Sequence, residues 1–143
     1  EMKNPQRMMR ALEVIESTGN SILFYQRGEK IKRDFSIVKV GLELPKEELV
    51  ERINRRVDMM MEEGQLEEVK SLATFKKFNA LQTVGYSELF DYLDKRITLP
   101  EAIERIKIST RQYAKRQLTW FKKDEDISWF QPDNLKEIIN HTI

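Results

Sequence analysis

The chain has 143 residues, 40% of them hydrophobic and 34% charged, and a net charge of +1, which predicts no particular partner by itself. This profile suits one compact, charge-rich domain over residues 1–143. No apolar run reaches the roughly 18 residues of a membrane span, so we expect no membrane partner. The lack of cysteine fits a reducing, intracellular setting, and we expect a cytoplasmic location. The absence of cysteine excludes disulfides, thiolate metal sites and a cysteine nucleophile.

The amino-terminal residues predict a short helix. Asn4 followed by Pro5 is typical of an N-cap and a first helical position, and apolar residues recur on one face up to a stop near Gly19. Ser21 to Arg27 indicates a second piece that is either helical or irregular. Because residue 1 is not an initiator methionine and no signal peptide is present, we expect the chain to be part of a longer protein.

The segment from Phe35 to Leu44 predicts a strand. It is rich in β-branched residues and nearly apolar over Ile37 to Leu42, as in a strand that is buried on both faces of a sheet. Such a strand needs neighbours, and only Ser128 to Phe130 is a second, short candidate. We therefore expect one clear buried strand whose main sheet partners lie outside this chain.

Helices dominate the rest of the chain. Pro45 at a helix start and Gly64 after a last turn bracket a helix of about 18 residues. Leu99 and Pro100 open a long helix that continues to about Lys123. Shorter helices are expected over residues 66–75, 87–94 and 134–141, with a connection over residues 76–83. The fold class predicted is α/β, but mainly helical.

The long helix has an uneven charge pattern. Between Arg105 and Lys123 the sequence contains seven basic residues and no acidic one. An ordinary solvated face mixes both signs of charge, so the pattern favours a surface that binds a polyanion, above all RNA. Angular spacing places Trp120 on the core side, and leaves Tyr113 undecided. The alternatives are a solvated charged face and a helix that meets an acidic protein partner.

Four short stretches, in order along the chain, resemble one family, the bacterial tRNA dimethylallyltransferases or tRNA isopentenyltransferases. The stretches are Asn4 to Val14 (NPQRMMRALEV), Arg56 to Met60 (RVDMM) with Gly64, Ala80 to Glu88 (ALQTVGYSE), and Thr110 to Phe121 (TRQYAKRQLTWF). The resemblance implies a P-loop-type, nucleoside triphosphate hydrolase-like fold, of which this chain is the C-terminal half. It also implies Mg²⁺ as a cofactor and a monomeric full-length protein.

The family activity that the resemblance implies is a tRNA modification. A dimethylallyl group passes from dimethylallyl diphosphate to N6 of the adenosine immediately 3′ of the anticodon. The family's glycine-rich phosphate loop has no counterpart here, since none of the five glycines belongs to a G-x-x-x-x-G-K-[ST] pattern. The segment of the catalytic aspartate and the helical insertion have no counterpart in this chain either. We therefore expect no catalytic residue and no Mg²⁺ ligand in this chain, which should bind but not catalyse alone.

The resemblance also implies that three stretches of this chain contact tRNA, with the anticodon stem-loop as the bound part. They comprise Gln6, Arg7, Met8, Met9 and Arg10; Leu81, Gln82, Thr83, Val84, Gly85, Tyr86, Ser87 and Glu88; and Lys115, Arg116, Gln117, Leu118, Thr119, Trp120, Phe121 and Lys122. The basic residues suit phosphates, and Gln82 and Gln117 suit base edges. Gly85 would allow close approach of RNA and Tyr86 would stack on a base. The alternative for these two residues is a helix start with a core tyrosine.

Arg56 and Arg111 are the candidates for binding the diphosphate, because a guanidinium offers a planar fork of donors and stays charged. For Arg56 the alternative is an ion pair with Asp58, Glu62 or Glu63. Two other functions remain open for the whole chain. One is a helical RNA-binding module that acts without catalysis, and the other is a helical protein-interaction domain.

Overall fold

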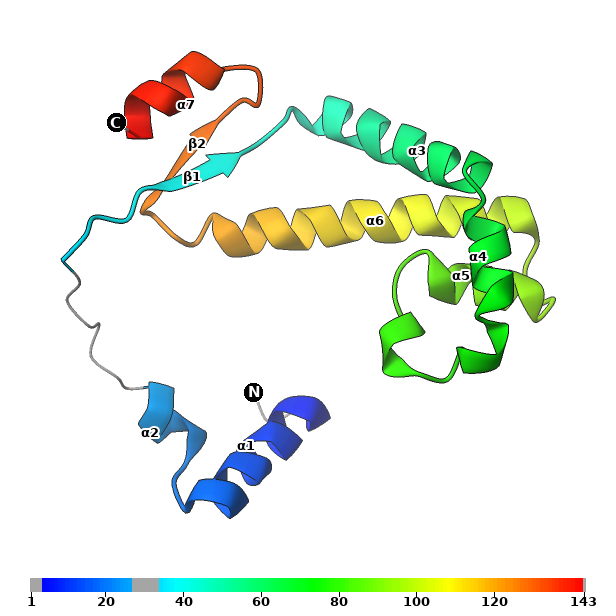
Figure 1. The fold of residues 1–143 in the computed structure, drawn as a ribbon, viewed down its shortest axis with the longest axis horizontal. Helices are drawn as coiled ribbons and strands as arrows, with labels where there is room; N and C mark the ends of the chain where they lie inside the picture. The colour runs from blue at the N-terminus through cyan, green and yellow to red at the C-terminus, as the bar shows by residue number, and fades with distance from the viewer. Residues whose placement is uncertain (1–3, 27–33, 143) are drawn as a thin grey trace. The chain divides into compact units, whose positions relative to one another are not determined.

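Figure 1 shows the computed structural model of the chain, which describes residues 4–26 and 34–142. The chain divides into two compact units, residues 1–37 and residues 38–143. The buried hydrophobic side chains form one cluster in the second unit, made of Val57, Val69, Leu89, Phe90, Ala102 and Ile106. The assignment of residues 1–143 to one portion of a larger domain stays a prediction. No helix in the described part is long and apolar enough to cross a membrane.

The first unit contains α1 (Pro5–Thr18) and α2 (Ile22–Gln26). The predicted helix start is confirmed, because the Asn4 side chain accepts a hydrogen bond from the Arg7 backbone N–H at 3.3 Å. The predicted stop is confirmed as well, since Gly19 adopts a left-handed conformation with φ of 72°. The predicted second piece is α2; Arg27, its expected last residue, lies outside the described residues.

The second unit contains a two-stranded parallel sheet in which β1 (Lys39–Leu42) pairs with β2 (Ile127–Phe130). The strand candidate at 128–130 is therefore real, and it supplies a sheet partner within the chain. The prediction of a strand buried on both faces is wrong here, because Leu42 is 54% exposed. An apolar sequence indicates that a strand can be buried, but burial also needs a covering layer on each face.

Five helices complete the second unit: α3 (Lys46–Glu62), α4 (Gln65–Ser71), α5 (Tyr86–Leu93), α6 (Leu99–Phe121) and α7 (Leu135–Thr142). Two 3₁₀ turns, η1 (Ala73–Phe75) and η2 (Asn79–Leu81), lie between α4 and α5. The helix expected over residues 66–75 thus ends early and continues as a 3₁₀ turn. The expected connection over residues 76–83 contains the second turn.

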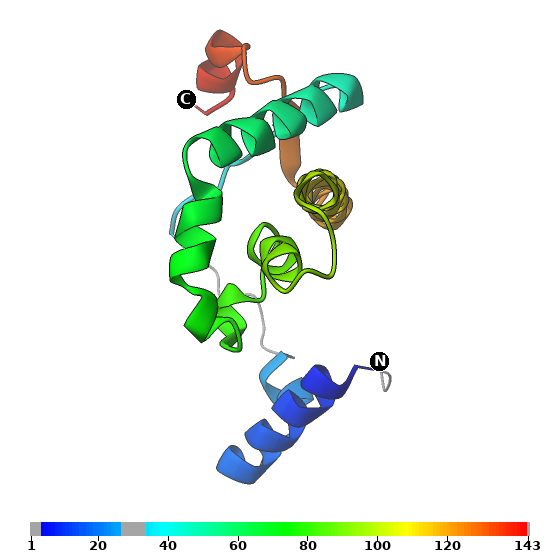
Figure 2. The same ribbon diagram turned by 90° about the vertical axis from the view of Figure 1, so that its right-hand side faces the viewer.

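The core lies around the first half of α6. In Figure 2, where α6 is seen end-on, α3, α4 and α5 lie to one side of it. Ala102 and Ile106 are buried there, but Tyr113 is 52% and Trp120 68% exposed. The expectation that Trp120 belongs to the core is therefore wrong for this chain. The angular spacing of apolar residues gives their direction around a helix, not how far along it the neighbouring helices extend.

Candidate functional site

The basic stretch of α6 is partly neutralised by acids from other parts of the unit. Lys107 forms an ion pair with Asp58 of α3 at 2.6 Å, and Lys122 forms one with Glu43, after β1, also at 2.6 Å. Arg111 pairs with Glu104 at 3.1 Å. Asp58 and Glu43 are distant in sequence but contact the same helix. The absence of acids between residues 105 and 123 therefore does not leave all the cations of this stretch free to bind a polyanion.

Two cations that form no ion pair within the described residues lie in the last two turns of α6. Lys115 and Arg116 are exposed, and neither forms an ion pair with any residue in the ranges 4–26 and 34–142. Gln117 beside them is exposed as well. In the same turns Trp120 packs edge-on against Phe121, with ring centroids 4.9 Å apart. This end of α6 therefore presents free cations next to exposed aromatic rings.

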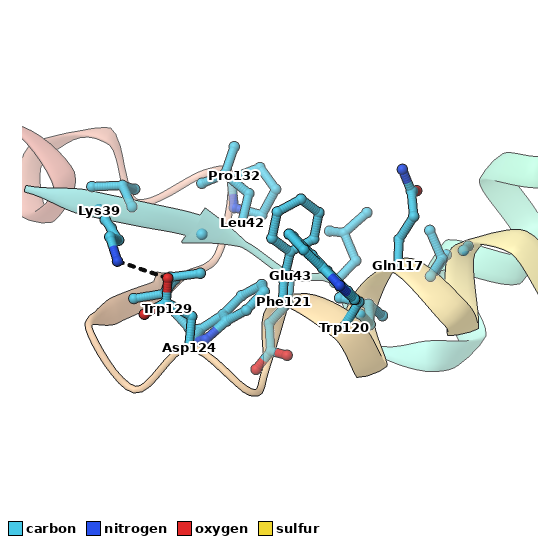
Figure 3. A pocket seen from close by; sticks show the side chains of 16 residues that line it. Lys39, Leu42, Glu43, Gln117, Trp120, Phe121, Asp124, Trp129 and Pro132 are labelled. Carbon is cyan, nitrogen blue, oxygen red and sulfur yellow. Dashed lines mark hydrogen bonds and ion pairs between the residues drawn. The ribbon is translucent and has the colours of Figure 1, made fainter. Parts of the chain in front are cut away.

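A cavity of about 790 Å³ lies between this end of α6 and the sheet. Figure 3 shows its lining, with Gln117, Trp120 and Phe121 from the helix and Leu42 and Trp129 from the strands. Most of its lining is apolar. It is an open hollow beside the predicted RNA-contacting stretch, and its walls are fixed by the end of a helix and by two paired strands.

An ion-pair cluster that sequence reasoning missed fixes the sheet next to the end of α6. Lys39 of β1 donates to Asp124 at 2.7 Å and to Asp126 at 3.3 Å, and the first contact is drawn in Figure 3. These hydrogen bonds, to Asp124 above all, raise the pKa of Lys39. No local signal predicts such a cluster, because the strand pairing that assembles it joins distant segments.

The two arginines predicted to bind diphosphate lie on α3 and α6, but not side by side. The Arg111 guanidinium donates to the Asn54 side chain of α3 at 3.0 Å. Residues two apart on a helix point about 200° apart, so Arg56 lies on the other side of α3 from Asn54. Arg56 is exposed and forms none of the three predicted ion pairs within the described residues. Its role in binding diphosphate, like that of Arg111, stays a prediction.

A cleft of about 590 Å³ runs between α3 and α6. Its floor is apolar and includes Leu49 and Ile53, while Arg111, Lys115 and Lys122 lie along its α6 side. One flank of the basic helix therefore borders α3 instead of facing open solvent. Of its cations, Lys115 is the one that has no acidic partner among the residues described.

The predicted stretch from Leu81 to Glu88 covers the end of the loop before α5 and the first turn of that helix, and several of its residues stabilise this helix start. The Gly85 N–H donates to the Glu88 carboxylate at 2.9 Å, and the Gln82 side chain donates to the Lys76 carbonyl at 2.6 Å. Gly85 is buried with φ of 96°, and a Cβ there would lie 2.8 Å from the Gln65 side chain. The close approach at Gly85 is therefore made by Gln65. Within this stretch, Thr83 and Val84 are exposed.

Tyr86 packs against the core cluster and donates from its hydroxyl to Glu68 at 2.6 Å. Gly85 and Tyr86 thus form a helix start with a tyrosine that packs on the core, as the alternative expected, and their contact with tRNA stays a prediction. The hydrogen bond to Glu68 raises the pKa of Tyr86 above its ordinary value of 10.0, with partial burial as a second cause.

The raised pKa of Tyr86 predicts a loss of stability in alkali. Below pH 10 the neutral hydroxyl keeps its hydrogen bond to Glu68, and this bond contributes fully to the free energy of unfolding. As the pH rises through the folded-state pKa of Tyr86, ionisation of the hydroxyl removes that contribution. We expect urea unfolding of the Tyr86→Phe variant to change less between pH 8 and pH 11 than that of the original chain. Equal pH dependence of the two proteins would contradict this role of the hydroxyl.

The third predicted stretch, Gln6 to Arg10, lies in the first two turns of α1 and is exposed throughout. Arg10 forms an ion pair with Glu13, one turn later, at 2.9 Å. Met8 and Met9 are 48% and 62% exposed. This stretch belongs to the first unit, whereas the other two belong to the second.

The two stretches of the second unit lie at different ends of α6. Helix α5 packs on the first half of α6, around Ala102 and Ile106, whereas Lys115 begins the other stretch. From Ala102 to Lys115 the helix rises by about 20 Å, at 1.5 Å per residue. A ligand that contacts both stretches is therefore an extended one.

Comparison with known proteins matches residues 1–124 to the family described as IPP transferase. The chain belongs to the IPP transferase family. Among the relatives of the chain is tRNA dimethylallyltransferase 1 of Bacteroides thetaiotaomicron, 49% identical over 141 residues, which are 99% of this chain and 46% of the relative. The recognition of the family from four short stretches is confirmed.

Solved structures agree with this family. The tRNA isopentenylpyrophosphate transferase of Bacillus halodurans superposes with a TM-score of 0.69 at 38% identity, covering 99% of this chain and 45% of that one. A eukaryotic dimethylallyltransferase acting on tRNA gives a TM-score of 0.71 at 32% identity, with 88% and 35% covered. The chain spans about half the length of the curated relatives it matches.

Mg²⁺, the cofactor that the family resemblance implies, stays a prediction for the part of the chain that the structure describes. No three Asp, Glu or His side chains gather there closely enough to hold a metal ion. The side chains present suit binding of an anionic ligand by cations and aromatic rings.

Proposed function

We propose that this chain contributes the tRNA-contacting surface of a tRNA dimethylallyltransferase and two arginines toward its diphosphate substrate. The observation that carries the proposal is the free cation pair Lys115 and Arg116 beside exposed Trp120. Cations hold phosphates, and aromatic faces stack on unpaired bases, so the combination suits RNA better than a protein partner. Relatives named for tRNA modification support the same assignment.

The proposed RNA is an anticodon stem-loop. Two of the expected contact stretches are separated by about 20 Å along α6, which a hairpin can bridge and a single nucleotide cannot. Phosphate contacts by Lys115 and Arg116 would fix the register of the RNA without reading its sequence. The exposed amide of Gln117 in the next position has the donor and acceptor needed to read a base edge.

The proposed reaction attaches a dimethylallyl group to N6 of the adenosine immediately 3′ of the anticodon. The amine nitrogen bonds to the allylic carbon and the carbon–oxygen bond to diphosphate breaks. The amine gives up its proton to the catalytic aspartate that the family resemblance implies, which has no counterpart in this chain. Arg56 and Arg111 are proposed to neutralise the departing diphosphate. Mg²⁺ would supply further positive charge. A P-loop-type core, a monomeric enzyme and a cytoplasmic location complete the proposal and rest on the family resemblance.

The proposal predicts that Lys115→Ala combined with Arg116→Ala weakens binding to an anticodon stem-loop. Each lost phosphate contact lowers the slope of log affinity against log salt by about 0.7 to 0.9, so the slope should fall by roughly 1.5. Fluorescence anisotropy of a labelled stem-loop, titrated at several salt concentrations, measures both quantities.

A matched control is the pair Arg55→Ala and Lys136→Ala. These residues are also one arginine and one lysine, both exposed and without an ion pair in the described ranges, and they lie outside the predicted stretches. The control should retain both affinity and slope. If both double variants lose the same affinity, the binding follows total charge, and if neither does, the end of α6 is a solvated face.

A further inference from the structure

Two phenylalanines are exposed on the loop that joins α4 to α5, the green loop of Figure 1. Phe75 is 50% and Phe78 63% exposed, and their ring centroids lie 6.1 Å apart with 30° between the ring planes. Exposed apolar rings forgo the free energy of burial, and a pair on one loop indicates a contact surface. Neither residue belongs to the stretches predicted to contact tRNA.

The loop that carries these rings is closed on itself by hydrogen bonds. The Phe78 N–H donates to the Phe75 carbonyl at 2.9 Å, and the Gln82 side chain donates to the Lys76 carbonyl at 2.6 Å. Lys76 also forms an ion pair with Asp94, after α5, at 2.7 Å. The backbone that carries the two rings is therefore held in place before any ligand binds, which lowers the entropic cost of binding.

The charge next to the rings is positive. The charge of Lys76 is balanced by Asp94, which Arg96 also contacts. Lys77, between the two phenylalanines in sequence, is exposed and forms no ion pair with any residue that the structure describes. A free cation with neighbouring aromatic faces is the arrangement that proteins use to bind single-stranded nucleic acid.

We propose that Phe75 and Phe78 form a stacking platform for one unpaired base of the bound RNA, with Lys77 at an adjacent phosphate. The platform rests on the proposed function and extends it to the first part of this loop, residues 72–79, which lies outside the four stretches of the family resemblance. Its position supports this, because the same loop continues into Gln82, Thr83 and Val84, the exposed residues of a predicted tRNA stretch. The ring centroids are too close for a base to enter between them, so the base stacks on their outer side.

The test compares Phe75→Leu/Phe78→Leu with Phe75→Trp/Phe78→Trp. Leucine keeps an apolar side chain of similar size but loses the aromatic face, whereas tryptophan retains and enlarges that face. We expect the leucine variant to bind the anticodon stem-loop on the order of tenfold more weakly, and the tryptophan variant to match or exceed the original chain. Because the rings are exposed, both variants should fold, which circular dichroism verifies.

Abasic substitution in the RNA loop then locates the partner base. Each unpaired nucleotide is made abasic in turn, and at the stacked position the leucine variant should no longer differ from the original chain. Leucine variants that bind every RNA as tightly as the original chain would overturn the platform alone; an apolar contact with a protein partner would give that result. Failure of the original chain to bind the stem-loop would overturn the proposed function as well.

Discussion

Mixed with dimethylallyl diphosphate, Mg²⁺ and an unmodified tRNA, the 143-residue chain alone should form no prenylated adenosine. The diphosphate leaves with concentrated negative charge, and catalysis requires a cradle of donors around it. Glycine-rich loops supply such donors from their backbone, and none of the five glycines of this chain belongs to that pattern. Mass spectrometry of the digested tRNA measures the product directly.

The same preparation should still bind the anticodon stem-loop, which shows that the missing product is not caused by an unfolded chain. The tRNA dimethylallyltransferase 1 of Bacteroides thetaiotaomicron, of which this chain covers 46%, serves as the parallel positive control. Measurable prenylation by the chain alone would contradict the expectation that it supplies contacts without a complete active site.

A second large effect is expected from Gly85→Ala. The backbone at Gly85 has φ of 96°, which side chains rarely adopt, and the added methyl group would lie 2.8 Å from the amide nitrogen of Gln65. The backbone strain should cost about 1–3 kcal/mol of unfolding free energy, and displacing the end of the buried Gln65 side chain should add to this loss. Urea denaturation followed by circular dichroism measures this loss, and tRNA binding should weaken with it.

Gly64→Ala separates the two causes. Gly64 has φ of 99°, but nothing lies within 4 Å of the position where its Cβ would be, so only the backbone strain remains. This variant should lose less stability than Gly85→Ala. Adding Gln65→Ala to Gly85→Ala should remove the contribution of overpacking, measured against Gln65→Ala alone. Equal losses at the two glycines would show that Gln65 plays no part.

Signals that act over a few residues predicted the local structure well. Asn4, Gly19 and Gly64 mark helix ends, and each does so through its own side chain or backbone. The exposure of Trp120 and Leu42 was not predictable, because it depends on which distant elements cover them. The sequence shows that an apolar side chain prefers burial, but it does not show whether another helix or strand packs over it.

The candidate site shows the same division between local and distant effects. The basic character of α6 is visible in the sequence, but the partners of Lys107 and Lys122 are acids outside the helix. Arg111 meets Asn54, 57 residues earlier in the chain. The sequence therefore indicates which residues have suitable chemistry, whereas the packing of α3 against α6 decides which cations stay free.

The pairing of β1 with β2 has a consequence for the order in which the chain folds. Lys39 meets Asp126, 87 residues later, so forming the sheet closes a long loop. Closing such a loop costs roughly 4 kcal/mol of chain entropy, whereas each helix forms from neighbouring residues in microseconds. The helices should therefore form first and the strands pair last. If the strands pair after the rate-limiting step, the contacts of the sheet lower the unfolding rate more than they raise the folding rate.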